Sequence, residues 1–324
     1  MAEALSVTST QVAAGDCVIA VAYNFHGTRL ACATAKHTIK IYNIDDEETM
    51  DFSAEMQAKG PPGRQGKGET KLAWAHHQLG QVVAVTFSGL PVSLWVETSG
   101  HDKEWIPIPS PLPPTHAVVR DISFSPKEYG NQLAVAYSDG IVQLFEAAAS
   151  LPPTAWAMCN HFKATNGQGG CTCVSWRGAT VSEPGPLMAV GTSGHGASVW
   201  QYENSLMSWQ ECTRFGEGHV ACLAWAPTLG RPSEIVAVGT GSSVQIWALS
   251  GTADADMAVE KVDTVSAGAP VWKVEWNMLG TSLAVSTDSA EVLVFSPNLV
   301  GKFTLSGRFV GNNGTDSGRV VPME

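Results

Sequence analysis

Two glycine-rich segments contain the residue types that nucleotide-binding and acyl-transfer sites use. The first, from Gly60 to Gly68, has the glycines and the lysine of a phosphate-binding loop, but the glycine spacing is wrong and no Ser or Thr follows Lys67 to hold Mg²⁺. The second, from Gly191 to Gly196, matches neither the dinucleotide-binding pattern nor the G-x-S-x-G pattern of hydrolases. Neither segment therefore predicts a catalytic or cofactor-binding loop.

The thiol and imidazole side chains give no stronger signal. Cys171 and Cys173 fall on one face of an expected strand, and no second cysteine pair follows at zinc-binding spacing. His76 and His77 could be metal ligands. A similar segment of the chain has Pro126 and Lys127 at the corresponding positions, and such residues are typical of a turn, so we interpret the two histidines as turn residues. The seven cysteines are odd in number and lie mostly in apolar runs, which indicates reduced thiols of a cytosolic or nuclear protein. We expect no enzyme activity, no cofactor and no metal.

The charge balance argues against a nucleic-acid partner. The chain of 324 residues has a formal net charge of −11, which opposes binding to a polyanion. Its basic segment 59–71 and its acidic run 45–48 are expected to be solvated loops, with a docking patch for a basic partner as the alternative for the acidic run. The negative net charge leads us to expect no direct nucleic-acid binding. No apolar stretch approaches the roughly 18 residues that span a bilayer, so we also expect no membrane insertion.

The organisation that would position any site is a sixfold repeat. Six alternating apolar runs each carry an aromatic residue, at spacings of 51, 50, 52, 49 and 51 residues: Tyr23, Trp74, Phe124, Trp176, Trp225 and Trp276. A second run follows each of them with an alanine at a matching place: Ala31, Ala84, Ala134, Ala189, Ala237 and Ala284. A third run ends in another aromatic residue: Tyr42, Trp95, Phe145, Trp200, Trp247 and Phe295. This repetition predicts strands that recur as a unit.

A fourth run between repeats completes four short strands per unit, and almost nothing in the chain has helical periodicity. A four-stranded unit cannot bury both faces alone, so we expect the units to stack radially as an all-β, six-bladed β-propeller. The expected blade cores lie near residues 17–44, 71–96, 118–146, 171–202, 220–249 and 271–296. They form one domain over residues 1–310, and a flexible tail follows at 311–324.

The repeats resemble WD repeats. Trp95, Trp200 and Trp247 occupy the tryptophan position of that family, and Asp139 matches the aspartate that ties the repeat together. Other repeats depart from the pattern, since Lys36-His37 and Leu90-Pro91 stand where an aspartate is expected. The resemblance therefore implies a weakened side-chain network, with packing holding those blades.

The amino-acid sequences of individual segments resemble one branch of the family. Asn24 to Ala31, Trp74 to Val82, Ser138 to Ala147 and Val271 to Asn277 look like the WD-repeat nucleoporins of the Sec-thirteen-homologue (SEH) type, siblings of the propeller in the outer coat of COPII vesicles. The resemblance implies a non-catalytic scaffold subunit of the Y-shaped subcomplex of the nuclear pore complex at the nuclear envelope. The implied partners are an α-solenoid nucleoporin that donates a blade in trans and other subunits of the Y complex.

The same resemblance implies a second assembly and leaves alternatives. Relatives of this type also serve in the GATOR/SEA complex, which regulates TOR signalling at the lysosome or vacuole surface. A COPII-type vesicle coat propeller is one alternative function, and a reader of peptides or histone tails is another.

The closure of the expected ring depends on which terminus supplies the outer strand of blade six. The segments 6–14 and 302–310 compete for that place, and we expect the second to take it because it directly follows the third strand of the blade. The junction between blades one and six would then stay open until a partner completes it. We expect Ile39 and Ile41 on one side, and Val292 and Val294 on the other, to be exposed there and to bind the partner.

Overall fold

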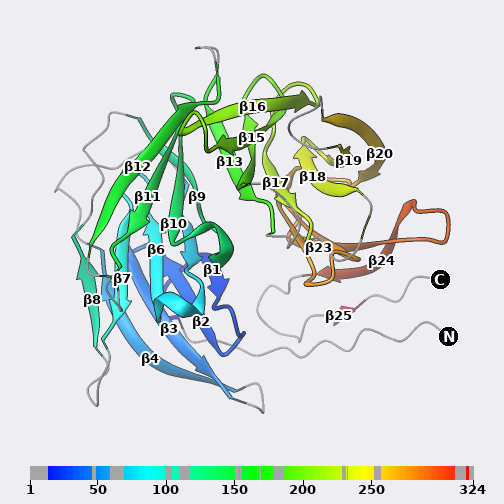
Figure 1. The fold of residues 1–324 in the computed structure, drawn as a ribbon. Coiled ribbons are helices and arrows are strands. Elements are labelled where there is room, and N and C mark those ends of the chain that lie inside the picture. The colour runs from blue at the N-terminus through cyan, green and yellow to red at the C-terminus, as the bar shows by residue number, and fades with distance from the viewer. Residues whose placement is uncertain are drawn as a thin grey trace. The chain divides into compact units, whose positions relative to one another are not determined.

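Regular structure in the computed structural model is almost entirely β-strand (Figure 1). The structure describes residues 14–45, 49–58, 69–98, 104–109, 117–149, 153, 155–165, 167, 169–178, 185–227, 231, 233–251, 257–310 and 319–320. Within these ranges the helical segments are two short 3-10 turns, η1 (His77–Leu79) and η2 (Lys127–Tyr129). No described helix has the length and apolar character needed to cross a membrane. The all-β prediction is confirmed.

The strands form six sheets, and in each sheet four strands that follow one another in the sequence pair antiparallel. We number the sheets as blades in chain order. Blade one contains β1 (Val18–Tyr23), β2 (Arg29–Thr34), β3 (Thr38–Ile44) and β4 (Met50–Gln57). Blade two contains β5 (Lys71–Trp74), β6 (Val82–Thr86), β7 (Ser93–Glu97) and β8 (Trp105–Ile108). Blade three contains β9 (Val119–Phe124), β10 (Gln132–Tyr137), β11 (Ile141–Ala147) and β12 (Trp156–Lys163).

The other three sheets repeat this order. Blade four contains β13 (Cys171–Trp176), β14 (Leu187–Thr192), β15 (Ala197–Glu203) and β16 (Ser208–Phe215). Blade five contains β17 (Cys222–Trp225), β18 (Glu234–Thr240), β19 (Ser243–Ser250) and β20 (Ala258–Ser266). Blade six contains β21 (Val271–Trp276), β22 (Leu283–Thr287), β23 (Glu291–Pro297), β24 (Phe303–Val310) and β25 (Arg319–Val320).

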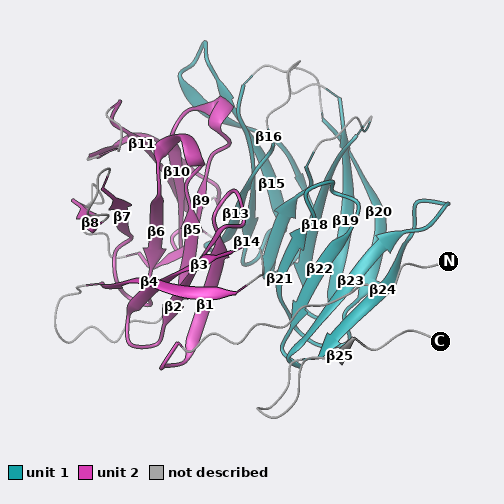
Figure 2. Ribbon diagram, turned by 90° about the horizontal axis from the view of Figure 1, so that it is seen from below, with its two compact units in different colours: residues 1–9, 168–324 teal, residues 10–167 magenta. Residues whose placement is uncertain are grey.

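The chain divides into two compact units (Figure 2). Blades one to three lie in the unit that spans residues 10–167, which we call the N-terminal unit. Blades four to six lie in the unit that contains residues 168–324, which we call the C-terminal unit.

A row of three large side chains crosses each blade and explains the periodic aromatic residues. The last residue of each first strand is the repeat aromatic. It pairs with an apolar, non-aromatic residue of the second strand, which pairs in turn with the aromatic of the third strand. In blade one the row is Tyr23, Leu30 and Tyr42, and in blade five it is Trp225, Val236 and Trp247. Such cross-strand rows of aromatic and aliphatic residues stabilise the pleated sheet and fix its register.

The repeat alanines lie next to this row and point to the opposite face of the sheet, because alternate residues of a strand face opposite ways. Five of them are fully buried: Ala31, Ala84, Ala134, Ala189 and Ala237. The sixth, Ala284 in blade six, is only partly buried. A fully buried position with room for one methyl group explains why the sequence keeps a small residue there.

The hydrophobic core within each unit lies between adjacent blades. One cluster joins blades one and two, and another joins blades two and three. In the C-terminal unit the clusters join blades four and five and blades five and six. Burial therefore depends on stacking of neighbouring blades, as expected for units that cannot cover both faces alone.

The fourth strand of blade six comes from the segment that directly follows its third strand, as the sequence predicts. β24 pairs with β23 along eight residues, from Phe303 to Val310. Within the expected tail, Arg319 and Val320 pair with β24 as the short strand β25. The flexibility of the tail 311–324 otherwise stays a prediction, since its remaining residues lie outside the described ranges.

Three other expectations fall wholly or mainly on residues that the structure does not describe. These are the competing clasp segment 6–14, most of the basic segment 59–71, and the acidic run 45–48 beyond Asp45.

Candidate protein-binding faces

The third-strand residues opposite the repeat alanine define the face that a blade presents to the following blade of the same unit. Ile41 is opposite Ala31 in blade one, and Ile246 is opposite Ala237 in blade five. Both isoleucines are fully buried against the following blade of their own unit. We call this the following face of a blade, and the face that carries the aromatic row its preceding face.

The expectation that Ile39 and Ile41 are exposed for a partner is wrong. Neither side chain is accessible to solvent, because both pack with Val83 and Val85 of blade two. The reason is the direction in which the two side chains point from β3. Period-two alternation places Ile39 and Ile41 on one face of β3, and that face is the following face, which blade two covers.

Val292 and Val294 occupy the same register positions in blade six. Val294 is opposite Ala284 and Val292 is opposite Ser286, as Ile41 and Ile39 are opposite Ala31 and Ala33 in blade one. Blade six is the last blade of its unit, and Val292 has an exposed fraction of 37% while Val294 is partly buried. The following face of blade six is thus an accessible apolar surface, and a role of these two valines in binding stays a prediction.

The preceding face of blade one is accessible along its first strand. Val21 and Tyr23 have exposed fractions of 50% and 56%. The repeat aromatics Trp74 and Trp276, at the place of Tyr23 in their own blades, are partly buried, and Trp225 is buried. On the same face of blade one, Leu30, Cys32 and Tyr42 form a small buried cluster. β1 therefore presents an apolar strand that no blade of the N-terminal unit covers.

Repeat aromatics fasten one blade to the preceding one by hydrogen bonds. The indole Nε1 of Trp74 donates to the carbonyl oxygen of Ala22 at 2.9 Å, and that of Trp276 donates to the carbonyl oxygen of Ala224 at 3.1 Å. Each acceptor is the residue directly before the repeat aromatic of the preceding blade. Blade five uses a variant of this contact, since the main-chain N–H of Trp225 donates to the Ser175 hydroxyl at 3.1 Å.

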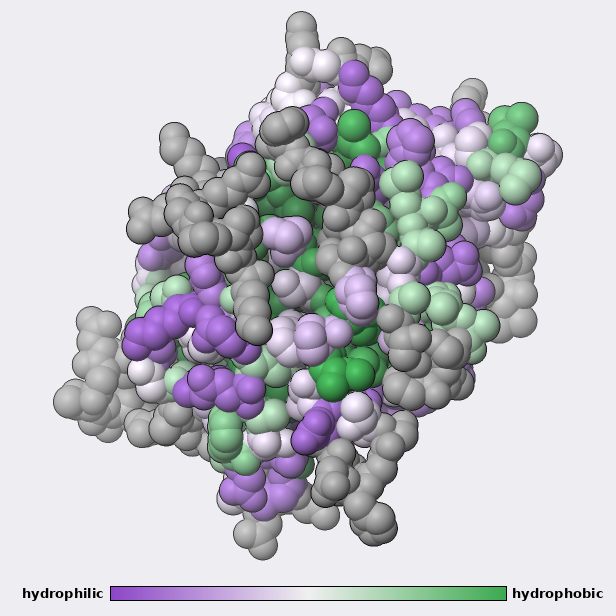
Figure 3. Space-filling view, turned by 90° about the vertical axis from the view of Figure 1, so that its left-hand side faces the viewer, coloured by the Kyte–Doolittle hydropathy of each residue, from purple (hydrophilic) through white to green (hydrophobic). Residues whose placement is uncertain are grey.

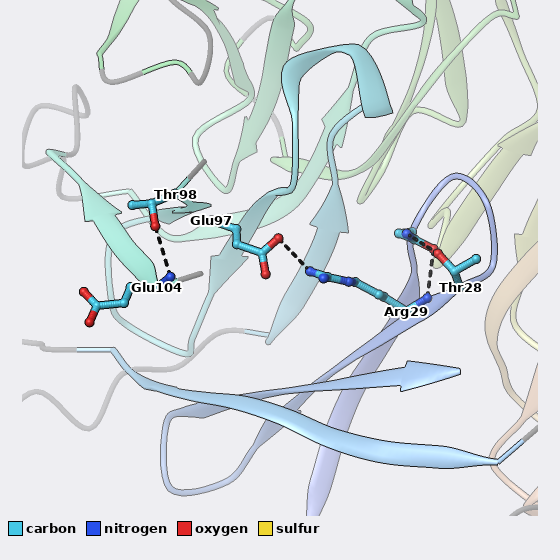
Figure 4. Close-up of polar contacts among 6 residues, drawn as sticks. Thr28, Arg29, Glu97, Thr98 and Glu104 are labelled. Carbon is cyan, nitrogen blue, oxygen red and sulfur yellow. Dashed lines mark hydrogen bonds and ion pairs between the residues drawn. The ribbon is translucent and has the colours of Figure 1, made fainter. Parts of the chain in front are cut away.

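An ion pair adds a charged contact between blades one and two (Figure 4). Arg29 of β2 donates to the Glu97 carboxylate of β7 at 3.0 Å, and the two side chains are only 14% and 10% exposed. The Asn24 side chain supports the arginine, because its Oδ1 accepts from the Arg29 main-chain N–H and its Nδ2 donates to the Thr28 hydroxyl. Nothing in the sequence pattern marks this pair, which is separated by 68 residues.

The WD-type positions make mostly local hydrogen bonds. The Asp139 carboxylate accepts from the main-chain N–H of Ile141 at 3.1 Å and so closes its own hairpin. Trp200 donates to the Ser198 hydroxyl, and Trp247 donates to the Gln245 side chain. The buried Nε1 of Trp95 has no hydrogen-bond partner in the part of the chain that the structure describes.

His76 and His77 belong to a surface cluster of rings. The Phe25 ring is edge-on to His76 and tilted against His77, with ring centroids 4.5 and 4.9 Å apart, and the His26 ring centroid is 4.7 Å from that of His77. The His76 Nδ1 accepts from the Gln78 main-chain N–H and caps the turn η1, so turn chemistry is the correct interpretation of this pair. Burial, followed by the neighbouring His77 and Lys127, lowers the pKa of His76 below its ordinary value.

The cysteines and the second glycine-rich segment have structural surroundings. Cys171 and Cys173 are buried in β13. The segment from Gly191 to Gly196 forms the β14–β15 hairpin. Among the described residues, no group of three or more His, Cys, Asp or Glu side chains could hold a metal ion.

Two exposed hairpin tips in the C-terminal unit carry large apolar residues that the repeat pattern does not predict. Leu299 and Val300 between β23 and β24 are almost fully exposed, and Leu206 and Met207 between β15 and β16 are exposed over more than half of their surface. An Asn before each pair was the available signal, since Asn favours tight turns. Elsewhere, Figure 3 shows hydrophobic residues gathered in small groups near the centre of one face, with hydrophilic residues around them.

The six sheets, five of four strands and one of five, and their repeat residues define a six-bladed β-propeller of the WD-repeat class. The accessible features of the described residues are packing faces and turns, so a function has to be argued from these surfaces and not from the fold alone.

Comparison with known proteins gives the closer relationship. The chain is 25% identical to Nucleoporin SEH1 of Homo sapiens over 335 residues, which covers 94% of this chain and 88% of the relative. It is also 25% identical to Nucleoporin SEH1 of Xenopus tropicalis over 321 residues, covering 92% and 86%. No family model matches the chain. The fold and these relatives point to a non-catalytic scaffold protein, consistent with an SEH1-type WD-repeat nucleoporin.

Solved structures support the fold alone. The structure of Sqt1 from Chaetomium thermophilum superposes with a TM-score of 0.60 at 16% sequence identity, covering 91% of this chain and 75% of that one. Sqt1 bound to the N-terminus of the ribosomal protein L10 gives the same values.

Proposed function

We propose that this chain is a scaffold subunit of the nuclear pore complex at the nuclear envelope. The observation that carries the proposal is the similarity to Nucleoporin SEH1, which extends over 94% of the chain rather than over one repeat. The relatives carry the nucleoporin name, which favours the nuclear pore over a vesicle coat or a peptide reader. In this role the protein supports transport of proteins and mRNA by holding other subunits in place.

The partner that we propose is an α-solenoid nucleoporin of the Y-shaped subcomplex that donates a blade in trans. Support comes from each unit separately. In the C-terminal unit, blade six leaves its following face accessible at Val292 and partly accessible at Ala284. In the N-terminal unit, blade one leaves Val21 and Tyr23 accessible. A donated β-blade offers apolar faces, so it is the kind of partner that can cover either of these surfaces. Residues 1–310 then act as one domain.

A second proposed assembly is the GATOR/SEA complex at the lysosome or vacuole surface, with the propeller again acting as a scaffold. It uses the same packing faces, so one copy of the chain serves one assembly at a time.

The test is affinity purification of the chain, tagged at its natural locus, followed by mass spectrometry of the recovered proteins. We expect scaffold subunits of the nuclear pore, with TOR regulators as a second set. Recovery of vesicle coat subunits in place of pore subunits, or of no assembly, would overturn the proposal.

A further inference from the structure

The internal repeats show how a strand at the place of β1 engages a preceding blade. In both units a repeat aromatic at the end of the first strand donates a side-chain hydrogen bond to the preceding blade. Trp74 does so to the Ala22 carbonyl and Trp276 to the Ala224 carbonyl. The acceptor is in each case the main-chain carbonyl directly before the repeat aromatic of that blade.

Tyr23 holds this position in blade one, at the end of β1. It has a hydroxyl donor where Trp74 and Trp276 have an indole N–H. More than half of its surface is exposed. Val21, two residues earlier and on the same face of β1, is exposed to a similar degree. The position that fastens other blades to a preceding blade is thus accessible in the N-terminal unit.

We propose that Tyr23 is the anchor by which blade one engages the partner's β-blade, its hydroxyl donating to a main-chain carbonyl of the partner's innermost strand. This inference rests on the proposed function, because it assumes a partner blade. Val21 precedes Tyr23 by two residues on the same face of β1, as Leu72 precedes Trp74 on β5, and Leu72 and Trp74 both pack against the cluster between blades one and two. A hydrogen bond to the main chain requires a β-strand of suitable register, but it depends little on the identity of the partner's side chains.

The experiment uses the full chain co-expressed with the full-length α-solenoid nucleoporin of the same organism. The dissociation constant is measured by mass photometry as the purified complex is diluted. Tyr23→Phe removes only the hydroxyl, and we expect about five-fold weaker binding, the effect of one lost hydrogen bond. Tyr23→Ala also removes the ring and should weaken binding by more than ten-fold. Tyr23→Trp restores an indole donor and should bind within about two-fold of the parent.

Tyr202→Phe is the matched control for loss of a hydroxyl, since Tyr202 lies on β15 of the C-terminal unit. A second readout is hydrogen exchange, in which the amides of Val21 to Tyr23 should gain protection when the partner is bound.

The outcomes separate this inference from the proposed function. Normal binding by Tyr23→Phe and Tyr23→Ala, with the parent complex intact, would overturn the anchor and leave the partner in place. A parent chain that forms no complex would overturn both. A homodimer of the chain that Tyr23→Ala dissolves would identify a second copy as the occupant and also overturn the proposal.

Discussion

The guanidinium of Arg29 in β2 lies 3.0 Å from the carboxylate of Glu97 in β7, and the pair is nearly buried at the contact between blades one and two. Because both side chains are largely removed from water, either charge alone would destabilise the contact between the two blades, and the pair stabilises it only when both charges are present. The same contact carries the indole hydrogen bond from Trp74 to Ala22, so blades one and two are joined by packing, a neutral hydrogen bond and an ion pair.

Removing one partner of this ion pair should destabilise the N-terminal unit. Arg29→Ala leaves the Glu97 carboxylate buried without its counter-charge, so we expect a loss of about 3 kcal/mol in the free energy of unfolding. Urea denaturation measures this loss. Lys273→Ala is the control, because its ion pair with Glu275 is exposed and should contribute less than about 1 kcal/mol. Equal effects of the two variants would contradict the inter-blade role of Arg29.

The repeat register can be tested inside blade five. Trp225 and Ala237 are both buried, on opposite faces of the blade. Trp225→Ala should cost about 3–5 kcal/mol through the cavity that it leaves, and Ala237→Leu about 1–3 kcal/mol through overpacking. Calorimetry gives both values. The exposed Trp272 provides the control, since Trp272→Ala should change the melting temperature little. Parent-like melting of both core variants would refute the register.

Acidification should weaken the contact between the first turns of blades one and two. The folded state lowers the pKa of His76 below its ordinary value of 6.5, so the unfolded chain takes up the proton first as the pH falls. The stability that His76 contributes is therefore present above pH 6.5 and is lost as the pH falls below that value. The groups that face it are His26, His77, Lys127 and Glu128.

His76→Asn tests this pH dependence, because asparagine can keep the turn cap while removing the titrating ring. We expect the melting temperature of the parent to drop more between pH 7.5 and pH 5.5 than that of the variant. His219→Asn, at an exposed site, should behave like the parent. Identical pH profiles for all three proteins would show that the cluster does not couple to folding.

The two third-strand positions should separate binding from folding. Val292→Glu places a charge on the accessible face of blade six, so we expect a folded protein whose complex with the α-solenoid nucleoporin is at least ten-fold weaker. Ile41→Glu places the same charge in a closed core and should unfold the N-terminal unit. Circular dichroism and co-elution separate the two effects. Met158→Glu, exposed on β12, is the control that should retain binding.

The sequence predicts strand positions well because the repeat aromatics obey both a period of two within the strand and a period near 50 along the chain. Each of the six lies at the end of its first strand, from Tyr23 to Trp276. Alternation alone does not say which neighbour a face meets. Ile39 and Val292 have the same pattern, yet one is closed in a core and the other is accessible.

Other contacts are not predicted by any periodic pattern in the sequence. Arg29 and Glu97 meet because two blades stack, and the ring cluster of Phe25 and His76 arises because two turns of adjacent blades end at the same edge. Such pairs depend on the distance between blades rather than on local sequence, so they become visible only in the structure. The assignment of residues 1–310 to a single domain also stays a prediction.

The most direct test of the central claim is co-expression of the full chain with the full-length α-solenoid nucleoporin of the same organism, followed by size-exclusion chromatography with light scattering. We predict that the lone chain is poorly soluble or aggregates, whereas the two proteins together elute as a soluble complex containing both chains. A lone chain that is a stable, soluble monomer and that elutes apart from the nucleoporin would contradict the account.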